Sequence, residues 1–333
     1  MSSAQATQAA PMWKVAVFVL LAAASALPWA SPAIALAVGI AVGLAGLSVF
    51  GALSKKVSKQ LIQWCVATLG LTVPLGQLWS IAREGLVFSA LTMILVFGLG
   101  ALLARLLRTG RDESILICAG TAVCGGSAIA ATGSAIGAAS ASMAIATGAV
   151  FILNAASLYI LPPIAHALHL SDVQFGTWAG IAIHDVASVT GAAKGYVAEG
   201  GVPGQALETA TVVKLARVLW IVPIALIAGW WVRRQRAGEG ASAGISGGVQ
   251  VPWIVVLFVL ACVLSALVPA VREHTKEIRF GAGLGFQLAL FLIGAGITRA
   301  AMKAVGWRVL VQALVLWLAL AGASLAAAKL TIS

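Results

Sequence analysis

Long and nearly uncharged runs of apolar residues most limit what this chain can fold into. Segments of about 20 apolar residues follow one another along the sequence, and a helix of that length crosses a lipid bilayer. Hydrophobic residues make up 61% of the chain and charged residues only 9%, whereas about a quarter of a soluble domain is charged. An ordinary soluble enzyme, a disordered chain and a secreted disulfide scaffold are therefore excluded.

Eleven of these apolar segments indicate membrane-spanning helices, so we predict an all-α polytopic membrane protein with a single domain, residues 1–333. The segments are continuously apolar, which favours helices over the alternating strands of a barrel. We expect an N-terminal tail at residues 1–12 and a cytoplasmic Gly- and Ser-rich linker at residues 233–250. The predicted spans are residues 13–29, 32–51, 60–80, 86–106, 114–137, 141–163, 174–195, 206–232, 251–270, 283–300 and 306–329.

Basic residues are divided unevenly between the two sets of predicted loops. Of the 21 Lys and Arg residues, thirteen fall on the side of the N-terminus and six on the opposite side. Because cytoplasmic loops carry the excess of basic residues, we expect a cytoplasmic N-terminus and an external C-terminus. The net charge of +11 then reflects membrane orientation, and the chain contains no basic block with interleaved aromatic residues that would indicate nucleic-acid binding.

An odd number of spans suggests an internal repeat behind one extra N-terminal helix. Five spans form each predicted repeat, residues 32–163 and 174–329, and the second copy must be inverted in the membrane. The fourth span of each repeat contains a segment that weakens a helix, CGGS at residues 124–127 and GAGIT at residues 294–298. We therefore predict that two broken helices cross near the membrane midplane.

Small residues dominate the segment CAGTAVCGGSAIAATGSAIGAASAS at residues 118–142. Each of its adjacent glycines weakens a helix by about 1 kcal/mol, and the serine that follows is suited to cap a new half-helix. A half-helix N-terminus presents backbone N–H groups and a positive dipole end, which attract anions. Close packing of helices through small residues is the alternative interpretation.

The residues expected to bind an anion at these breaks share small or hydroxyl-bearing side chains. Three of them recur every three residues, so we expect them to line one side of the span. The candidates are Thr121, Cys124, Gly125, Gly126, Ser127 and, on the inverted partner, Thr298.

His184 and Asp185 lie in the middle of the seventh predicted span, within GIAIHDVASVTGAAKGY at residues 180–196. Ionisable residues at membrane depth usually serve function. Because His titrates near neutral pH and a desolvated Asp can hold a proton, we predict that both take part in proton coupling. Along a continuous helix they point about 100° apart, so they form no catalytic pair. The alternative is structural: Asp185 pairs with a buried cation and His184 bonds to a backbone carbonyl.

Lys214 and Arg217 lie three residues apart in the eighth predicted span, so they share a helix face. The guanidinium fork suits an oxyanion, and the ammonium supplies a point charge. Together with Asp185, they leave a net positive interior that suits a small anionic substrate. The alternatives are that Lys214 extends to the outer interface or that the pair only neutralises Asp185.

Three motifs together resemble one known family. GTAVCGGSAIAA (residues 120–131), IHDVASVTGAA (183–193) and VKLARVLWIVP (213–223), in this order and spacing, resemble the YeiH-like sulfate exporters, which are UPF0324-type membrane proteins. The similarity covers most of the chain, including FLIGAGITRAAMKAVGWR at residues 291–308. The resemblance implies a bacterial inner-membrane protein, similar in plan to inverted-repeat transporters, whose substrate is sulfate or a related sulfonate. It marks the three motifs as signature segments without assigning a role to each residue.

We therefore expect a secondary active transporter that exports a small oxyanion, sulfate or an organosulfonate, by proton-coupled alternating access. A cation/proton antiporter that uses Asp185 and a passive anion channel are the alternatives. The chain has no GxxxxGK[ST] motif for ATP, and its four cysteines form no zinc-binding pattern. We expect no enzymatic activity, cofactor, metal or nucleic-acid partner; the expected partners are the anion and the lipid bilayer, and a homodimer is left open.

Overall fold

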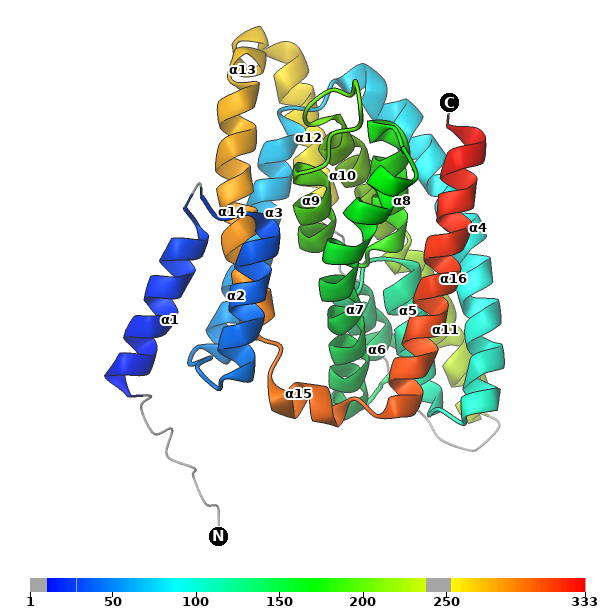
Figure 1. The fold of residues 1–333 in the computed structure, drawn as a ribbon. Coiled ribbons are helices and arrows are strands. Elements are labelled where there is room, and N and C mark those ends of the chain that lie inside the picture. The colour runs from blue at the N-terminus through cyan, green and yellow to red at the C-terminus, as the bar shows by residue number, and fades with distance from the viewer. Residues whose placement is uncertain (1–10, 28, 238–252, 333) are drawn as a thin grey trace.

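The computed structural model describes residues 11–27, 29–237 and 253–332, and these form sixteen helices without a strand (Figure 1). The predicted all-α class is therefore confirmed. Five helices within the described ranges are long and apolar enough to cross a membrane, and three shorter ones are also apolar. The long ones are Ile81–Leu107, Ser140–Ala167, Gln205–Gln235, Thr275–Ala295 and Trp307–Thr331. This supports a multi-pass membrane protein, while the number eleven and the inverted repeat stay predictions.

Within the described ranges, six helices from the first and last parts of the sequence pack into one group, which we call the small bundle (Figure 1). Its centre is a close contact of α2 with α14, made possible by glycines: a Cβ built on Gly39 or Gly294 would fall within 3 Å of backbone atoms of the other helix. Absent side chains thus let two backbones approach closely, as small residues do in membrane helices. The members are α1 (Met12–Ser25), α2 (Pro32–Leu44), α3 (Gly51–Gly70), α12 (Trp253–Leu267), α13 (Pro269–Glu273) and α14 (Thr275–Ala295).

Nine helices of the described part of the chain form a second group, the large bundle, which contains all three segments singled out in the sequence. A short helix, α15 (Arg299–Ala304), connects the two bundles at the lower end of Figure 1. The members are α4 (Leu75–Leu107), α5 (Arg111–Ala122), α6 (Gly126–Ile136), α7 (Ser140–Ala167), α8 (Asp172–Ala182), α9 (Val186–Lys194), α10 (Gln205–Val218), α11 (Ile221–Ala237) and α16 (Trp307–Thr331).

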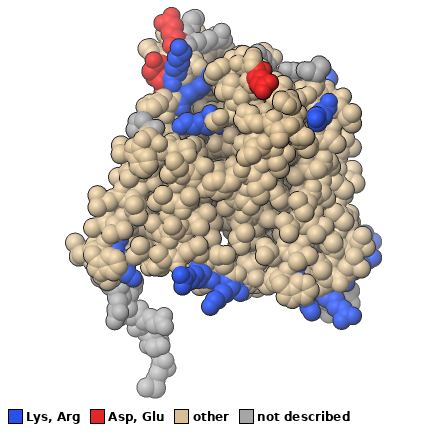
Figure 2. All heavy atoms as spheres, viewed as in Figure 1, with Lys and Arg blue, Asp and Glu red and all other residues tan. Residues whose placement is uncertain are grey.

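Charged side chains gather at the two ends of the molecule and leave a wide band without them (Figure 2). Such a band matches a surface that faces lipid. Helix α1 begins at the lower end and α16 finishes at the upper end, as an odd number of crossings requires (Figure 1). Which end faces the cytoplasm stays a prediction. The predicted linker at 233–250 continues α11 as far as Ala237, and its remainder, like residues 1–10, lies outside the described residues.

The two bundles contact each other through α9, and a crevice lies between them near α15. Gly191 of α9 lies directly against Leu290 of α14 and Pro32 of α2. Towards the lower end, a crevice lies between α7 and the α14–α15 link, and the surface is visibly hollowed there (Figure 2). The crevice is lined by Gly148, Phe151, Ile152, Gly296, Ile297, Ala301 and Met302.

Candidate functional site

The helix break predicted at the adjacent glycines is present. Helix α5 ends at Ala122, and α6 begins at Gly126. Between them Gly125 has φ of 61° and ψ of −123°, a backbone conformation that side-chain-bearing residues rarely adopt. The break therefore depends on Gly125, while Gly126 is the first residue of the new helix.

The predicted role of Ser127 as the cap of α6 is wrong. Gly125 occupies the cap position, no side chain caps the helix, and Ser127 is already its second residue. Thr121 and Cys124 are buried, whereas Ser127 is exposed. The three residues therefore do not line one side, because the turn at Gly125 interrupts the helical spacing on which that expectation depended.

Lys214 and Arg217 meet the break from α10, and both are completely buried. The Lys214 Nζ donates to the carbonyl of Val123 at 3.3 Å, and one Arg217 nitrogen donates to the carbonyl of Ala122. The other terminal nitrogen of Arg217 donates to Thr92 Oγ1 at 3.1 Å. Two cations thus hold the unpaired carbonyls at the negative end of α5, where positive charge is stabilised. Neither sequence-based alternative for this pair anticipated that role.

The seventh predicted span is interrupted, whereas the sequence pattern predicts one continuous helix. Helix α8 ends at Ala182, α9 begins at Val186, and Ile183 and Asp185 have extended backbone conformations. Asp185 is the cap of α9: its two carboxylate oxygens accept from the Ser188 N–H at 2.8 Å and the Ser188 hydroxyl at 2.7 Å. An aspartate at a helix N-terminus stabilises the helix through these bonds and the dipole. The prediction that His184 and Asp185 point about 100° apart on one helix is therefore wrong, because both residues lie between two helices.

His184 lies in this second break with no exposed surface. Its backbone N–H donates to Asn154 Oδ1 at 2.9 Å, and its Nδ1 lies 3.2 Å from the same oxygen. Asn154 of α7 is thus a site residue that the sequence-based predictions above did not include. The carbonyl of Ala182 accepts from the indole N–H of Trp317 at 3.2 Å. In the sequence, the signals that could have identified these two residues are the single amide of Asn154 and the position of Trp317 in the middle of an apolar segment.

The two breaks face each other where the helices cross. A Cβ built on Gly125 would lie 3.5 Å from His184 Cβ. The partner of the first break is therefore the link of α8 and α9, and not the predicted segment at residues 294–298. That segment does interrupt its helix, but Thr298 caps the short α15 by accepting from the Ala301 N–H at 3.2 Å. Gly296 and Ile297 of that segment line the crevice together with Phe151, whose ring also approaches Gly126.

The four half-helix ends at this crossing are not equally satisfied. The carbonyl ends of α5 and α8 receive donors from the cation pair and from Trp317, and the N-terminus of α9 holds the Asp185 carboxylate. The N-terminus of α6 has no side-chain cap. Backbone N–H groups at such an end, with buried positive charge beside them, favour an anion. Among the described residues, no group of three His, Cys, Asp or Glu is placed to hold a metal ion.

Comparison with known proteins places the chain in a family. The family model described as "Conserved hypothetical protein 698" matches residues 10–313. A UPF0324 membrane protein of Porphyromonas gingivalis is 40% identical over 306 residues, which are 90% of this chain and 87% of the relative. A UPF0324 membrane protein of Geobacter sulfurreducens is 36% identical over 94% of this chain and 96% of its own length. No solved structure matches the chain. As the three sequence motifs predicted, the chain belongs to the UPF0324 family of membrane proteins.

Proposed function

We propose that this protein is a secondary active transporter that exports a small oxyanion, such as sulfate or an organosulfonate, across the bacterial inner membrane. The observation that carries the proposal is the pair of fully buried cations, Lys214 and Arg217, at a broken helix whose new N-terminus has no cap. Asp185 is the carboxylate of this crossing, and it is already bonded to Ser188. One carboxylate against two cations leaves positive charge at a depth where charge is costly unless it is used.

The oxyanion would lie at the N-terminus of α6, next to Gly126 and Ser127. It would accept hydrogen bonds from backbone N–H groups of α6, as the Asp185 carboxylate accepts from the Ser188 N–H at the N-terminus of α9. Because Lys214 and Arg217 bond to the carbonyls of Val123 and Ala122, they would act on the anion mainly as fixed positive charge. This differs from the sequence-based expectation that the two side chains bind the anion directly.

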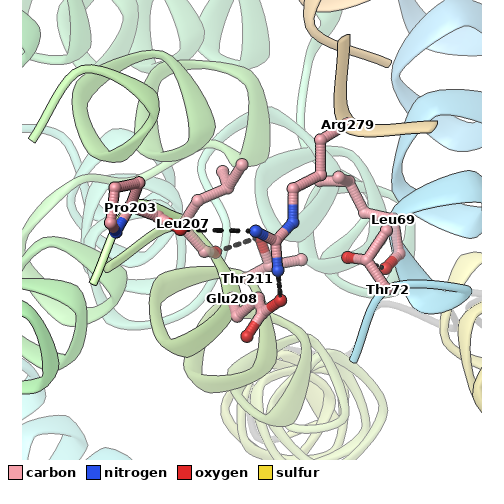
Figure 3. A network of polar contacts seen from close by, with 7 residues as sticks. All are labelled: Leu69, Thr72, Pro203, Leu207, Glu208, Thr211 and Arg279. Atoms are coloured by element: carbon pink, nitrogen blue, oxygen red, sulfur yellow. Dashed lines mark hydrogen bonds and ion pairs between the residues drawn. The ribbon is translucent and has the colours of Figure 1, made fainter. Parts of the chain in front are cut away.

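Two bundles with a polar contact between them towards one end and a crevice between them towards the other support alternating access. In the upper half, Arg279 of α14 bonds to Glu208 of α10 and to the carbonyl of Pro203, which connects the small bundle to the large one (Figure 3). Towards the lower end, Phe151 lines the crevice, and its ring also lies next to Gly126. Rocking of the small bundle would separate the upper contacts and close the crevice. His184 and Asp185 would carry the coupling proton.

Efflux from liposomes tests the proposal. Wild-type protein should move labelled sulfate or an organosulfonate out of loaded vesicles, and Lys214→Gln/Arg217→Gln should reduce that rate about tenfold or more, since one pairwise charge interaction of about 1.4 kcal/mol corresponds to a factor of ten. Lys329→Gln, which removes an exposed basic residue of α16, is the matched control and should keep the wild-type rate. Equal rates for the double variant and the wild type would exclude this site.

The same vesicles separate the other two candidate functions. Dissipation of a proton gradient that requires a cation and no anion would favour a cation/proton antiporter. Large unitary currents in a planar bilayer would favour a passive channel. Either result would overturn the proposed export of an oxyanion.

A further inference from the structure

The hydrogen bonds around His184 determine which ring nitrogen carries its proton. The backbone N–H of His184 can only donate, so the atom of Asn154 that it meets at 2.9 Å must be the carbonyl oxygen and not the amide nitrogen. That same oxygen lies 3.2 Å from His184 Nδ1. Because an oxygen acceptor cannot bond to an unprotonated nitrogen, Nδ1 must carry the hydrogen. In the neutral ring, Nε2 is then the unprotonated nitrogen, with a free lone pair.

Both ends of this pair remain unsatisfied in the present conformation. His184 Nε2 and Asn154 Nδ2 have no hydrogen-bond partner among the residues that the structure describes, and both side chains are buried, with His184 0% exposed and Asn154 2% exposed. Native proteins leave few buried polar groups unpaired, and each exception calls for an explanation. The unpaired His184 Nε2 is explained if this nitrogen binds a proton at another stage of the transport cycle.

We propose that Asn154 is a positioning residue that holds His184 with its proton on Nδ1, so that Nε2 alone takes up and releases the coupling proton. This inference deepens the proposed function and rests on it for the presence of a coupling proton. Uptake of one proton from water forms an imidazolium with an N–H at both nitrogens, and release restores the neutral ring without electron transfer. The bond from Nδ1 to Asn154 is kept throughout, so the ring does not turn over during the cycle.

The charged groups near His184 and Asn154 do not determine which ring nitrogen of His184 carries the proton. Lys214 and Arg217 lie within electrostatic range of the imidazole from α10, but both are donors and cannot accept from Nδ1. Asp185 follows in the same link, and its carboxylate is bonded to Ser188. From the other break, Cys124 lies near Lys214. None of these groups has a hydrogen bond to the ring, so the amide of Asn154 determines the tautomer.

Nitrogen NMR of the full-length protein in lipid tests the proposal directly. With ¹⁵N-labelled histidine and a His184→Gln variant to assign the signal, neutral His184 should show a protonated Nδ1 and an unprotonated Nε2. Asn154→Asp keeps an oxygen acceptor and should retain this pattern. Asn154→Leu has nearly the same shape without the acceptor and should show hydrogen on Nε2 in a substantial fraction of molecules.

Wild-type protein alone can overturn the proposal, so a variant that fails to fold does not weaken the test. A wild-type spectrum with hydrogen on Nε2 contradicts the assignment, and so does an Asn154→Leu spectrum that retains the wild-type tautomer. In liposomes, Asn154→Asp should keep a pH-dependent rate and Asn154→Leu should lose that dependence. Absence of oxyanion efflux from wild-type protein would instead count against the proposed function, because the spectrum is measured without transport.

Discussion

Gly125 is the residue at which the smallest chemical change should have the largest structural effect. Its φ of 61° and ψ of −123° exclude most side chains, and a Cβ there would also lie 3.3 Å from Val150 Cγ1. We expect Gly125→Ala to lower the free energy of unfolding by about 1–3 kcal/mol, the usual cost of a residue held in a sparsely populated backbone region. Chemical unfolding of purified protein in detergent measures this.

Gly126 offers a control one residue away. It is the first residue of α6, and a Cβ there would meet only the ring of Phe151 at 3.5–3.6 Å, an ordinary contact. Gly126→Ala should therefore unfold close to wild type, and equal losses for the two variants would mean that the positive φ of Gly125 is not what matters.

The indole of Trp317 should contribute through one hydrogen bond as well as through its bulk. Its N–H satisfies the Ala182 carbonyl at the end of α8, where no backbone donor is available within the helix. Trp317→Phe leaves that buried carbonyl without its donor, so we expect a loss of about 1–3 kcal/mol. Trp307→Phe alters a tryptophan that is 65% exposed and should change unfolding by less than about 0.5 kcal/mol. A similar loss for both would assign the effect to ring size alone.

Helices α10 and α14 are connected by the ion pair of Glu208 with Arg279. Both side chains are mostly shielded, with 16% and 27% of their surfaces exposed. We expect a coupling energy of about 1 kcal/mol from a double-mutant cycle of Glu208→Gln and Arg279→Gln, measured by chemical unfolding. Lys276→Gln, on the same helix as Arg279 but exposed, should show no coupling to Glu208→Gln. Additive effects within the Glu208 and Arg279 cycle would show that this pair does not hold the bundles together.

Local chemistry in the sequence accounts for the elements that were predicted correctly. Adjacent glycines at 125 and 126 weaken a helix wherever it lies, so the break between α5 and α6 could be found without a structure. Spacing alone also placed Lys214 and Arg217 on one face. Charge counting favoured an anion as their partner, but the structure turns them to the carbonyl end of α5. Only the path of the neighbouring helix, which is tertiary information, distinguishes these two uses of a buried cation.

The second break was missed because hydropathy does not register it. Residues 174–195 are predominantly apolar, so a continuous helix is the simplest interpretation of the sequence, and neither sequence-based interpretation of the ionisable pair, proton coupling or a buried ion pair, includes a helix cap. Aspartate is among the residues most favoured at a helix N-cap, so Asp185 in front of VASV is a sequence signal for the start of a helix. Reading Asp185 as a cap would have placed the break at His184. The role of Asn154, which comes from another helix, would still have required the structure.

At the scale of the whole molecule, alternating access requires the small bundle to move relative to the large bundle. A Cβ on Gly191 of α9 would lie 3.2 Å from Pro32 Cβ of α2, close to the separation in a disulfide, about 3.5–4.5 Å. With the four native cysteines replaced by alanine, Gly191→Cys/Pro32→Cys should form a disulfide on oxidation and stop oxyanion efflux. A reductant should restore the efflux.

A second cross-link controls for rigidity within a bundle. A Cβ on Gly229 of α11 would lie 3.3 Å from Ala135 Cβ of α6, and both helices belong to the large bundle. Gly229→Cys/Ala135→Cys should form a disulfide and leave efflux unchanged. If the disulfide between α2 and α9 formed and efflux continued, motion of one bundle against the other would not be part of transport.

The contact of α2 with α14 also has a consequence for the order in which the protein is made. The backbones meet through Gly39 and Gly294, so neither helix has its natural neighbour until both are present. The ribosome delivers α2 near the start of synthesis and α14 only near its end, after every helix of the large bundle except α16. We therefore expect α1 to α3 to wait in the membrane as an incomplete group while the intervening helices insert, and the small bundle to assemble last. During that interval the face of α2 that contains Gly39 can pack against any other membrane helix whose side chains at the contact are small.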